Sequence, residues 1–364
     1  MAAERPTASA AMATQQPVPS AALARIREST CAAGTPDELV AAVRGSTSAL
    51  AQAVAEGAPS DAVTAGLSGL IEAAVSTAVE LHLRLSGPAP VPFTWLLTGS
   101  VARGEAVLAS DVDTALAWDC DDDDLDVRHW MRSFATEVLT TLTVCGLSND
   151  SNGVRADDPR FSRSVAAWRT AVQGWAAEPW QNQADVYLSA VTDARAVRGA
   201  TTWEPVTDAV RAAFARPLVR TTMLRVATAL HPATGLLRGL VTESAGEHSG
   251  TLDLKQGGAA PAVATGRYLA TMLPSPAAGT ADRVQAAAAR GLLRTDDAHA
   301  LVDALAVVQQ VRLQHQVEQW RRGLHPDDRV QPDHLPPHRR RRLRDALRTV
   351  ARVQRALPLP VARP

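Results

Sequence analysis

One segment restricts the fold of this chain more than any other, the stretch FTWLLTGSVARGEAVLASDVDTALAWD at residues 93–119. It opens with a short apolar run between Pro92 and Gly99, a pattern typical of a buried strand. A Gly-Ser pair and a polar segment follow, and DVDTALAW then predicts a second strand. A third strand-like segment, ADVYLSAVTDARAVRG, lies at residues 184–199. Because helical patterns surround these strands, we expect an α+β protein with a small mixed sheet flanked by helices.

The residues before this segment predict a disordered arm followed by helices. Residues 1–33 are rich in small residues, Pro and Gln, and they lack a compact apolar core. A helical N-terminal segment is expected at residues 34–88, beginning with a capping box between Thr35 and Glu38. Apolar residues recur at helical spacing from Ser60 onward, and a run of prolines then ends the second helix.

The residues after the second strand predict mostly helices. The acidic run DCDDDD is interpreted as a solvated loop leading into a helix, because carboxylates suit a helix N-terminus. Helices are expected from Leu125 to Gly146 and at residues 162–176, 203–216, 280–292, 296–322 and 338–356. We therefore expect a sheet-containing domain at residues 89–200 and an all-helical C-terminal domain at residues 201–358.

The overall charge and the cysteines exclude several classes of protein. The formal net charge is −1, so no global positive field would recruit nucleic acid or an anionic membrane, and neither is expected as a partner. The cysteines, Cys31, Cys120 and Cys145, lie far apart, which disfavours a disulfide scaffold or a zinc site. Free cysteines and the absence of an uninterrupted apolar run of about 18 residues lead us to expect a cytoplasmic protein.

The second predicted strand carries two aspartates, one residue apart. On a strand, Asp111 and Asp113 would point the same way, roughly 7 Å apart, and would repel each other unless a cation lay between them. Upstream, Gly99 and Ser100 follow a strand and are expected to open a helix whose free amides hold phosphate. Arg103 could add bidentate contacts. Alone, a Gly-Ser pair is usually a turn and an aspartate pair a solvated edge, but in this order they indicate nucleotide chemistry.

This arrangement resembles the nucleotidyltransferase superfamily to which DNA polymerase beta belongs. GSVARGEAVLASDVDTAL looks like the corresponding motif of bacterial PII-uridylyltransferase-like proteins, in particular those with a dedicated C-terminal substrate-binding domain. The stretches that also fit that subgroup are NGVRADDPRFSRSVAAWRTAVQGW, TDARAVRG, GTLDLKQGGAAPAVATGRYLA and VRLQHQ. Relatives often carry cyclic-nucleotide-binding or CBS domains upstream, so a regulatory sensor protein on a separate chain is an expected partner here.

The resemblance implies transfer of a nucleoside monophosphate from a nucleoside triphosphate to a hydroxyl of a protein or small-molecule acceptor, with release of pyrophosphate. Mg²⁺, or alternatively Mn²⁺, would be held by Asp111 and Asp113, with Asp193 as the third carboxylate and proton acceptor. Gly99, Ser100 and Arg103 would hold the phosphates.

Three candidate residues have alternative interpretations. For Glu105, a salt bridge or helix cap that positions Arg103 is at least as good an explanation as direct catalysis. Asp193 could instead form an ion pair with Arg195. The third case is Lys255, the only lysine among 37 Lys and Arg residues.

In DLKQGGAAP, Lys255 is expected to contact nucleotide phosphate or the acceptor, with Asp253 and Arg267 as neighbours. Adjacent glycines would permit the close approach, and a compact ammonium differs from a planar guanidinium. The alternative is a surface lysine at the start of a helix.

Other features have simpler interpretations. His315 is expected to be a satisfied core histidine, and Trp168 and Trp175 to be core residues. HRRRRLRDALRTVARVQ is interpreted as a solvated helix face rather than a nucleic-acid patch. Competing functions are an antibiotic-modifying enzyme of the aminoglycoside type, a catalytically weak nucleotide-binding regulatory protein and a helical scaffold. Release of pyrophosphate would separate a transferase from a regulatory protein.

Overall fold

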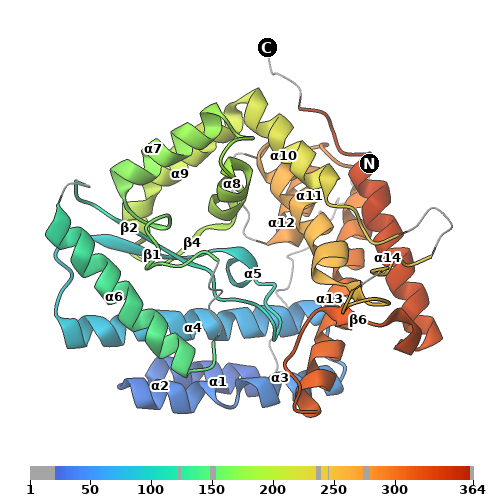
Figure 1. Ribbon diagram of the computed structural model, residues 1–364, viewed down its shortest axis with the longest axis horizontal. Coiled ribbons are helices and arrows are strands. Elements are labelled where there is room, and N and C mark those ends of the chain that lie inside the picture. The colour runs from blue at the N-terminus through green and yellow to red at the C-terminus, as the bar shows by residue number, and fades with distance from the viewer. Residues whose placement is uncertain are drawn as a thin grey trace, which may run out of the picture.

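A computed structural model describes residues 21–121, 124–147, 153–234, 239–244, 246–273 and 279–360. Helices surround a small four-stranded sheet (Figure 1), and the expected α+β class with its mixed sheet is confirmed. The sheet has the order β3-β2-β1-β4, with β1 antiparallel to β2 and β4, and β2 parallel to β3. The strands are β1 (Phe93–Leu97), β2 (Thr114–Trp118), β3 (Ser162–Ser164) and β4 (Arg195–Arg198).

Every residue of β1 and β2 is buried, because helices cover both faces of the sheet. Trp95 and Trp118 belong to the core shared with α4 and α6, whereas Leu96 and Ala117 belong to the core shared with α7, α8 and α9. These helices are α4 (Ser60–Ser86), α6 (Leu125–Val144), α7 (Val165–Ala177), α8 (Ala184–Asp193) and α9 (Ala200–Ala215). As expected, Trp168 is buried in the second of these cores, and Trp175 packs against it.

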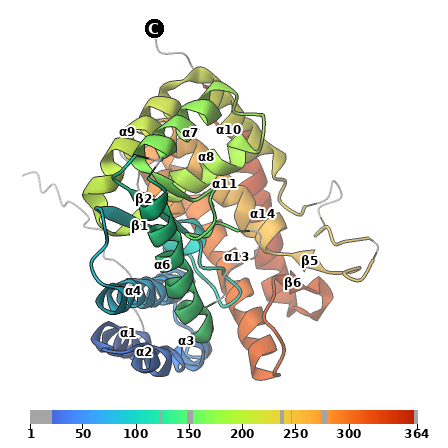
Figure 2. The same cartoon turned by 60° about the vertical axis from the view of Figure 1, so that its left-hand side comes forward.

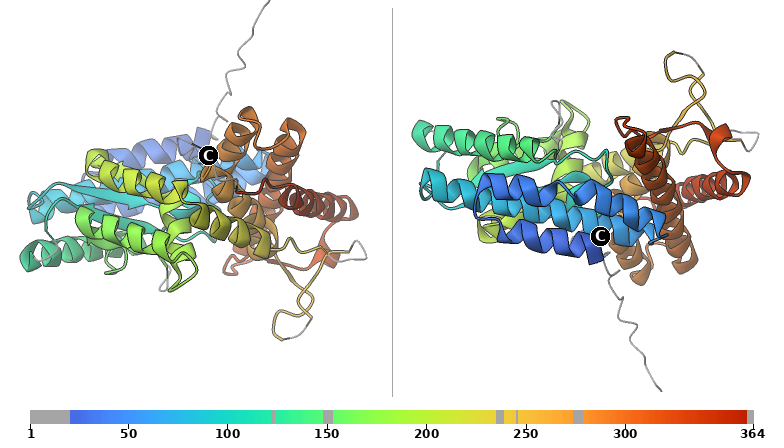
Figure 3. Two further views of the ribbon diagram at one scale, coloured as in Figure 1. Left: turned by 90° about the horizontal axis from the view of Figure 1, so that it is seen from above. Right: turned by 90° about the horizontal axis from the view of Figure 1, so that it is seen from below.

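Helix α4 is the central helix of the N-terminal half. Among the described residues it alone has the length and apolar composition of a membrane-spanning helix, but 72 % of that window is buried inside the molecule. Helices α1, α2 and α3 form a layer against it, which is visible from below in Figure 3. They span α1 (Ala21–Ala32), α2 (Pro36–Val43) and α3 (Ser46–Ala55), and Thr35 caps α2 as expected.

The prediction of an arm over residues 1–33 was wrong for residues 21–32, which form α1. Leu23 is buried and Ile26 packs against the same core, so two apolar side chains among small residues are enough to dock this helix on α4. Residues 1–20 lie outside the described residues.

The C-terminal half is helical apart from two short paired strands, β5 (Leu252–Asp253) and β6 (Arg329–Val330), which Figure 2 shows beside α13 and α14. Helices α11 (Ala260–Ala270), α12 (Thr280–Ala289), α13 (Thr295–Arg321) and α14 (Pro337–Arg355) share a third core. The buried apolar residues of α10 (Pro217–Ala229) belong instead to the second core. In α14 the apolar positions are buried and Arg339–Arg342 are exposed, so this arginine-rich stretch is a solvated helix face.

Three expected elements need correction. Residues 162–164 are strand β3 rather than the start of a helix. Residues 184–193 form helix α8 because Ala184, Leu188 and Val191 lie on one buried helical face, and the strand begins only at Arg195. Asp111 and Asp113 precede strand β2 instead of lying on it, because β1 ends at Leu97 and the chain turns at Gly99, directly after the Thr98 amide that binds the Asp113 carbonyl.

Candidate active site

The turn between β1 and α5 is in direct contact with Asp113. The Thr98 amide donates a hydrogen bond of 2.9 Å to the Asp113 carbonyl. Gly99 follows with φ +62°, and a Cβ atom there would lie 2.3 Å from the Asp113 Oδ2 atom. Glycine is therefore required for two reasons, the left-handed backbone and the close approach of the carboxylate.

Helix α5 (Gly99–Ala102) begins at the glycine of this turn, as expected for a Gly-Ser pair that opens a helix. Its first amides lack partners within the helix, as at any helix N-terminus. Ser100 is half-buried, and its carbonyl accepts a 2.8 Å hydrogen bond from the Glu105 amide. The turn thus brings a hydroxyl, backbone donors and the Asp113 carboxylate to one place.

Asp113 lies in an environment that opposes its negative charge. Burial and then the neighbouring Asp111 carboxylate raise the pKa of Asp113 to about 6, while Lys255, the Val154 amide and Arg103 lower it. A buried carboxylate beside a second carboxylate, with oxygen atoms as the donors, suits a hard divalent cation. The residues present therefore fit Mg²⁺ or Mn²⁺ by the chemistry of the donors.

Lys255 lies close to the aspartate pair in space, although it is 142 residues further along the chain than Asp113. Asp111, Asp253 and Lys255 line one cavity of about 310 Å³, together with residues 325–329. The side chain of Lys255 is exposed and forms no salt bridge with a described residue. The ammonium group is therefore available to an anionic ligand next to Asp111.

The backbone around Lys255 is held by several contacts. Lys255 begins a π-helical turn, η1 (Lys255–Ala259), a conformation that is frequent at functional sites. The Leu254 amide donates to the Asp328 carbonyl at 2.8 Å, and the Asp328 carboxylate is itself bound by Arg312 at 2.7 Å. Gly258 packs so closely that a Cβ atom would lie 2.9 Å from the Val308 side chain. The position of Lys255 is therefore fixed by α13 and the β5–β6 pair.

Arg103 and Asp193 belong to a buried network of charges. Arg103 binds Asp193 with one guanidinium nitrogen and Glu105 with another, the latter at 2.7 Å. Arg267 and Arg283 bind the same Asp193 carboxylate at 2.5 and 2.6 Å. Burial favours the neutral carboxyl, but the three arginines outweigh it and hold the pKa of Asp193 below its ordinary value. Asp193 thus lies among arginines from the C-terminal end of α5, from α11 and from α12.

The structure does not bring Asp193 to the aspartate pair as a third ligand. Among the described residues, no group of three or more His, Cys, Asp or Glu side chains is placed to hold a metal ion. The Asp193 side chain is fully buried and its two oxygens face arginines. As a metal ligand and proton acceptor, Asp193 therefore remains a prediction, and in this structure its contacts position Arg103.

Three further candidates have clear partners. Glu105 accepts from Arg103 and also from the Thr280 amide at 2.8 Å, so it positions Arg103 and binds the start of α12, the contacts that its alternative interpretation predicted. Arg195 pairs with Glu72 at 2.5 and 2.9 Å rather than with Asp193. His315 is half-buried at the surface rather than in the core, and its ring lies 3.3 Å from the exposed Asp327 carboxylate.

Sequence reasoning missed the residues of the helical half that support the site. Arg283 is buried and completes the contacts of Asp193, and Gln316 accepts from the Ala109 amide at 3.2 Å, just before Asp111. Arg283 lies on an ordinary helical pattern, so no local signal identified it. Gln316 lies in the VRLQHQ stretch that resembles the family, but its contact with Ala109 was not predicted. Asp328 had a weak signal, since it is the second of two adjacent aspartates in HPDDRV.

Comparison with known families agrees with this geometry. The family described as "Putative nucleotidyltransferase DUF294" matches residues 45–182, and the family described as "Putative nucleotidyltransferase substrate binding domain" matches residues 217–359. The chain belongs to this nucleotidyltransferase family. The resemblance drawn from the sequence is thus confirmed, and nucleotidyl transfer in general is the activity that the family indicates. No curated protein matches the chain.

The two matched regions contain different parts of the candidate active site. The first region contains Gly99, Ser100, Arg103 and the aspartate pair, and the second contains Lys255, Arg267 and Arg283. The candidate active site therefore draws on both regions. Asp193 lies between the two matches and contacts residues of both.

Proposed function

We propose that the protein transfers a nucleoside monophosphate from a nucleoside triphosphate to a hydroxyl of a protein or small-molecule acceptor, with release of pyrophosphate. The contact between Gly99 and Asp113 carries this proposal, because it joins a phosphate-binding turn to a carboxylate pair that suits a divalent cation. Uridylyl and adenylyl transfer are the forms that the resemblance favours.

In the proposed mechanism, Asp111 and Asp113 would hold Mg²⁺, which when bound would neutralise charge on the phosphates. The amides of the Gly99–Ser100 turn and the Ser100 hydroxyl would bind the β- and γ-phosphate oxygens. Lys255 would add a compact positive charge in the cavity that Asp111 also lines. Phosphoryl chemistry depends mainly on such positioning and charge neutralisation, so these contacts would supply most of the catalysis.

Arg103 would act at the edge of this site rather than as an independent phosphate ligand, because its guanidinium is already bound by Asp193 and Glu105. Its positive charge still lowers the pKa of Asp113. A role for Asp193 as third ligand would require a rearrangement that frees one of its oxygens from the arginines.

The contacts of Asp193 support a second candidate function, a nucleotide-binding regulatory protein with weak transfer activity. Because three arginines fully engage the Asp193 carboxylate, Asp111 and Asp113 would have to hold the cation without it. Such a protein would bind triphosphate with Mg²⁺ but release little pyrophosphate.

The test offers each of the four α-labelled triphosphates with Mg²⁺ or Mn²⁺ to the full chain, with cell extract from the source organism as the acceptor pool. We expect label transfer and pyrophosphate release from the wild type, and a loss of about a hundredfold or more in Asp111→Asn and Asp113→Asn. Asp119→Asn is the matched control, since Asp119 is an exposed aspartate after the same strand. Binding without pyrophosphate release would favour the regulatory function, and no binding would exclude both.

A further inference from the structure

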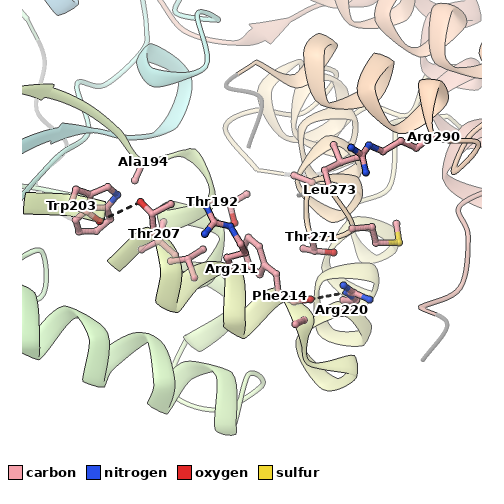
Figure 4. Close-up of a pocket in the computed structure, with 15 residues that line it drawn as sticks. Thr192, Ala194, Trp203, Thr207, Arg211, Phe214, Arg220, Thr271, Leu273 and Arg290 are labelled. Atoms are coloured by element: carbon pink, nitrogen blue, oxygen red, sulfur yellow. Dashed lines mark hydrogen bonds between the residues drawn. The ribbon is translucent and has the colours of Figure 1, made fainter. Parts of the chain in front are cut away.

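A second cavity lies away from the aspartate pair. It has a volume of about 280 Å³ and is lined by parts of α8, α9, α10, the end of α11 and Arg290 (Figure 4). It shares no lining residue with the cavity that contains Asp111 and Lys255. None of the contacts proposed for the nucleotide uses it, so its chemistry needs a separate explanation.

The walls of this cavity combine a large apolar surface with positive charge. Its apolar lining includes Trp203, Val210 and Phe214 from α9, and Met272 and Leu273 just after α11. Arginine is the only charged residue type among the lining residues, at Arg211, Arg220 and Arg290. An enclosed apolar wall with a few charged groups is the usual composition of a small-molecule site, and here all the charge has one sign.

The three arginines differ in whether a carboxylate already pairs with their positive charge. Arg211 pairs with the exposed Asp208 at 2.5 Å. Arg220 is half-buried and donates from Nε to the Phe214 carbonyl at 2.7 Å, and it has no carboxylate partner among the described residues. Arg290 is exposed and likewise forms no salt bridge within the described part of the chain. Positive charge at the cavity is thus only partly neutralised.

We propose that this cavity binds a small organic anion with an aromatic or branched apolar body. The body would lie against Trp203 and Phe214, and the anionic group would face Arg290. The positive charge of Arg211, which Figure 4 shows across the cavity from Arg290, would add longer-range attraction. A doubly anionic or strongly hydrated ligand fits less well, because most of the wall is apolar and would desolvate it.

The cavity also adjoins the buried network of charges. Thr192 and Ala194 line it on either side of Asp193, and Arg283 donates both to the Thr192 carbonyl at 2.8 Å and to the Asp193 carboxylate at 2.6 Å. An occupant would therefore touch the backbone that carries Asp193.

The test measures binding of two fluorescent probes to the full chain without nucleotide. One is anilinonaphthalene sulfonate, an apolar body with one anionic group, and the other is neutral N-phenyl-1-naphthylamine, which has the same rings without the sulfonate. The test variant is Arg211→Gln/Arg290→Gln. The matched control is Arg216→Gln/Arg294→Gln, which removes two exposed arginines near the same helix ends that do not line the cavity.

We expect the sulfonate to bind with energy transfer from tryptophan that falls in Trp203→Phe. Its affinity should drop about tenfold in the test variant and stay unchanged in the control variant, because charge-assisted contacts are lost only in the former. The neutral probe should bind both variants alike. Equal loss of both probes, equal loss in the two variants, or an unchanged affinity for the sulfonate would each overturn the proposal. None of these results depends on transfer activity.

Discussion

Two carboxylates near the turn, Asp113 and Asp193, have opposite surroundings. Burial and Asp111 raise the pKa of Asp113 to about 6. Asp193 is buried more completely, yet three arginines hold its pKa below the ordinary value. A bound cation stabilises a carboxylate whose charge is not balanced by its neighbours. It adds little to a carboxylate that arginines already neutralise. This comparison favours Asp113, and not Asp193, as the first ligand for a metal ion.

The raised pKa of Asp113 predicts a measurable pH dependence of stability. Because the folded protein holds this proton to a higher pH than the unfolded chain, the resulting stabilisation is complete below the ordinary pKa of 3.8 and is lost as the pH rises through about 6. Without divalent cations, wild type should therefore lose on the order of 2–3 kcal/mol more unfolding free energy than Asp113→Asn between acidic and neutral pH. Urea unfolding with a chelator measures this difference.

The control for that experiment is Asp119→Asn, whose pH profile should follow that of the wild type. Parallel profiles for wild type and Asp113→Asn would contradict the raised pKa.

Replacing Asp193 should be severely destabilising. Asp193→Asn leaves three arginines around a neutral amide, and removal of one partner from a buried ion pair typically costs about 3–5 kcal/mol. Because the pKa of Asp193 is depressed, its contribution is complete above the ordinary value of 3.8 and is lost only in stronger acid. Urea unfolding at neutral pH measures the loss. In Asp333→Asn, which breaks an exposed pair with Arg340, little should change, and an equal effect of the two substitutions would refute the structural role.

At the scale of elements, the turn from β1 into α5 determines the geometry of the site. Gly99→Ala should push the Asp113 carboxylate aside, since a Cβ atom there would lie 2.3 Å from Oδ2. Gly104→Ala is a matched control, because Gly104 has a similar positive φ and a Cβ atom there would meet nothing within 4 Å. Both variants should lose about 1 kcal/mol of stability from backbone strain. Only Gly99→Ala should weaken Mn²⁺ binding, by roughly tenfold or more, as measured by electron paramagnetic resonance. Equal Mn²⁺ affinities would contradict this role.

Elements with a strong local pattern could be predicted from the sequence, and those defined by distant partners could not. The apolar run of β1 and the helical spacing of α4 were sufficient to identify both. Strand β3 was missed because three residues give no periodicity, and it exists only through its pairing with β2. The strand assigned around Asp111 was too long because the sequence does not show where β1 leaves the sheet.

The same distinction applies to the site. Gly99, Ser100, Asp111 and Asp113 are close in sequence and formed a recognisable motif. The surroundings of Asp193 could not be predicted, because its arginines come from positions 103, 267 and 283. Lys255 was singled out because it is the sole lysine and lies beside paired glycines in a family-like stretch, and the structure places it in the cavity that contains Asp111.

At the scale of the whole molecule, the helical half completes a site that the sheet begins. Lys255 lies beside the aspartate pair, while Gln316 holds the loop before Asp111 and Arg267 binds Asp193. These contacts join segments that are more than 70 residues apart in sequence. Under the proposed function, nucleotide binding would depend on residues of both matched family regions.

The measurement that tests this account most directly is calorimetric binding of the four triphosphates, as analogues that resist cleavage at the α-phosphate, to the full chain with and without Mg²⁺. We expect Mg²⁺-dependent binding to the wild type, no detectable binding to Asp113→Asn, and about tenfold weaker binding to Lys255→Gln. Binding that needs no Mg²⁺ and is equal in all three proteins, or no binding of any triphosphate, would contradict the assignment of the active site.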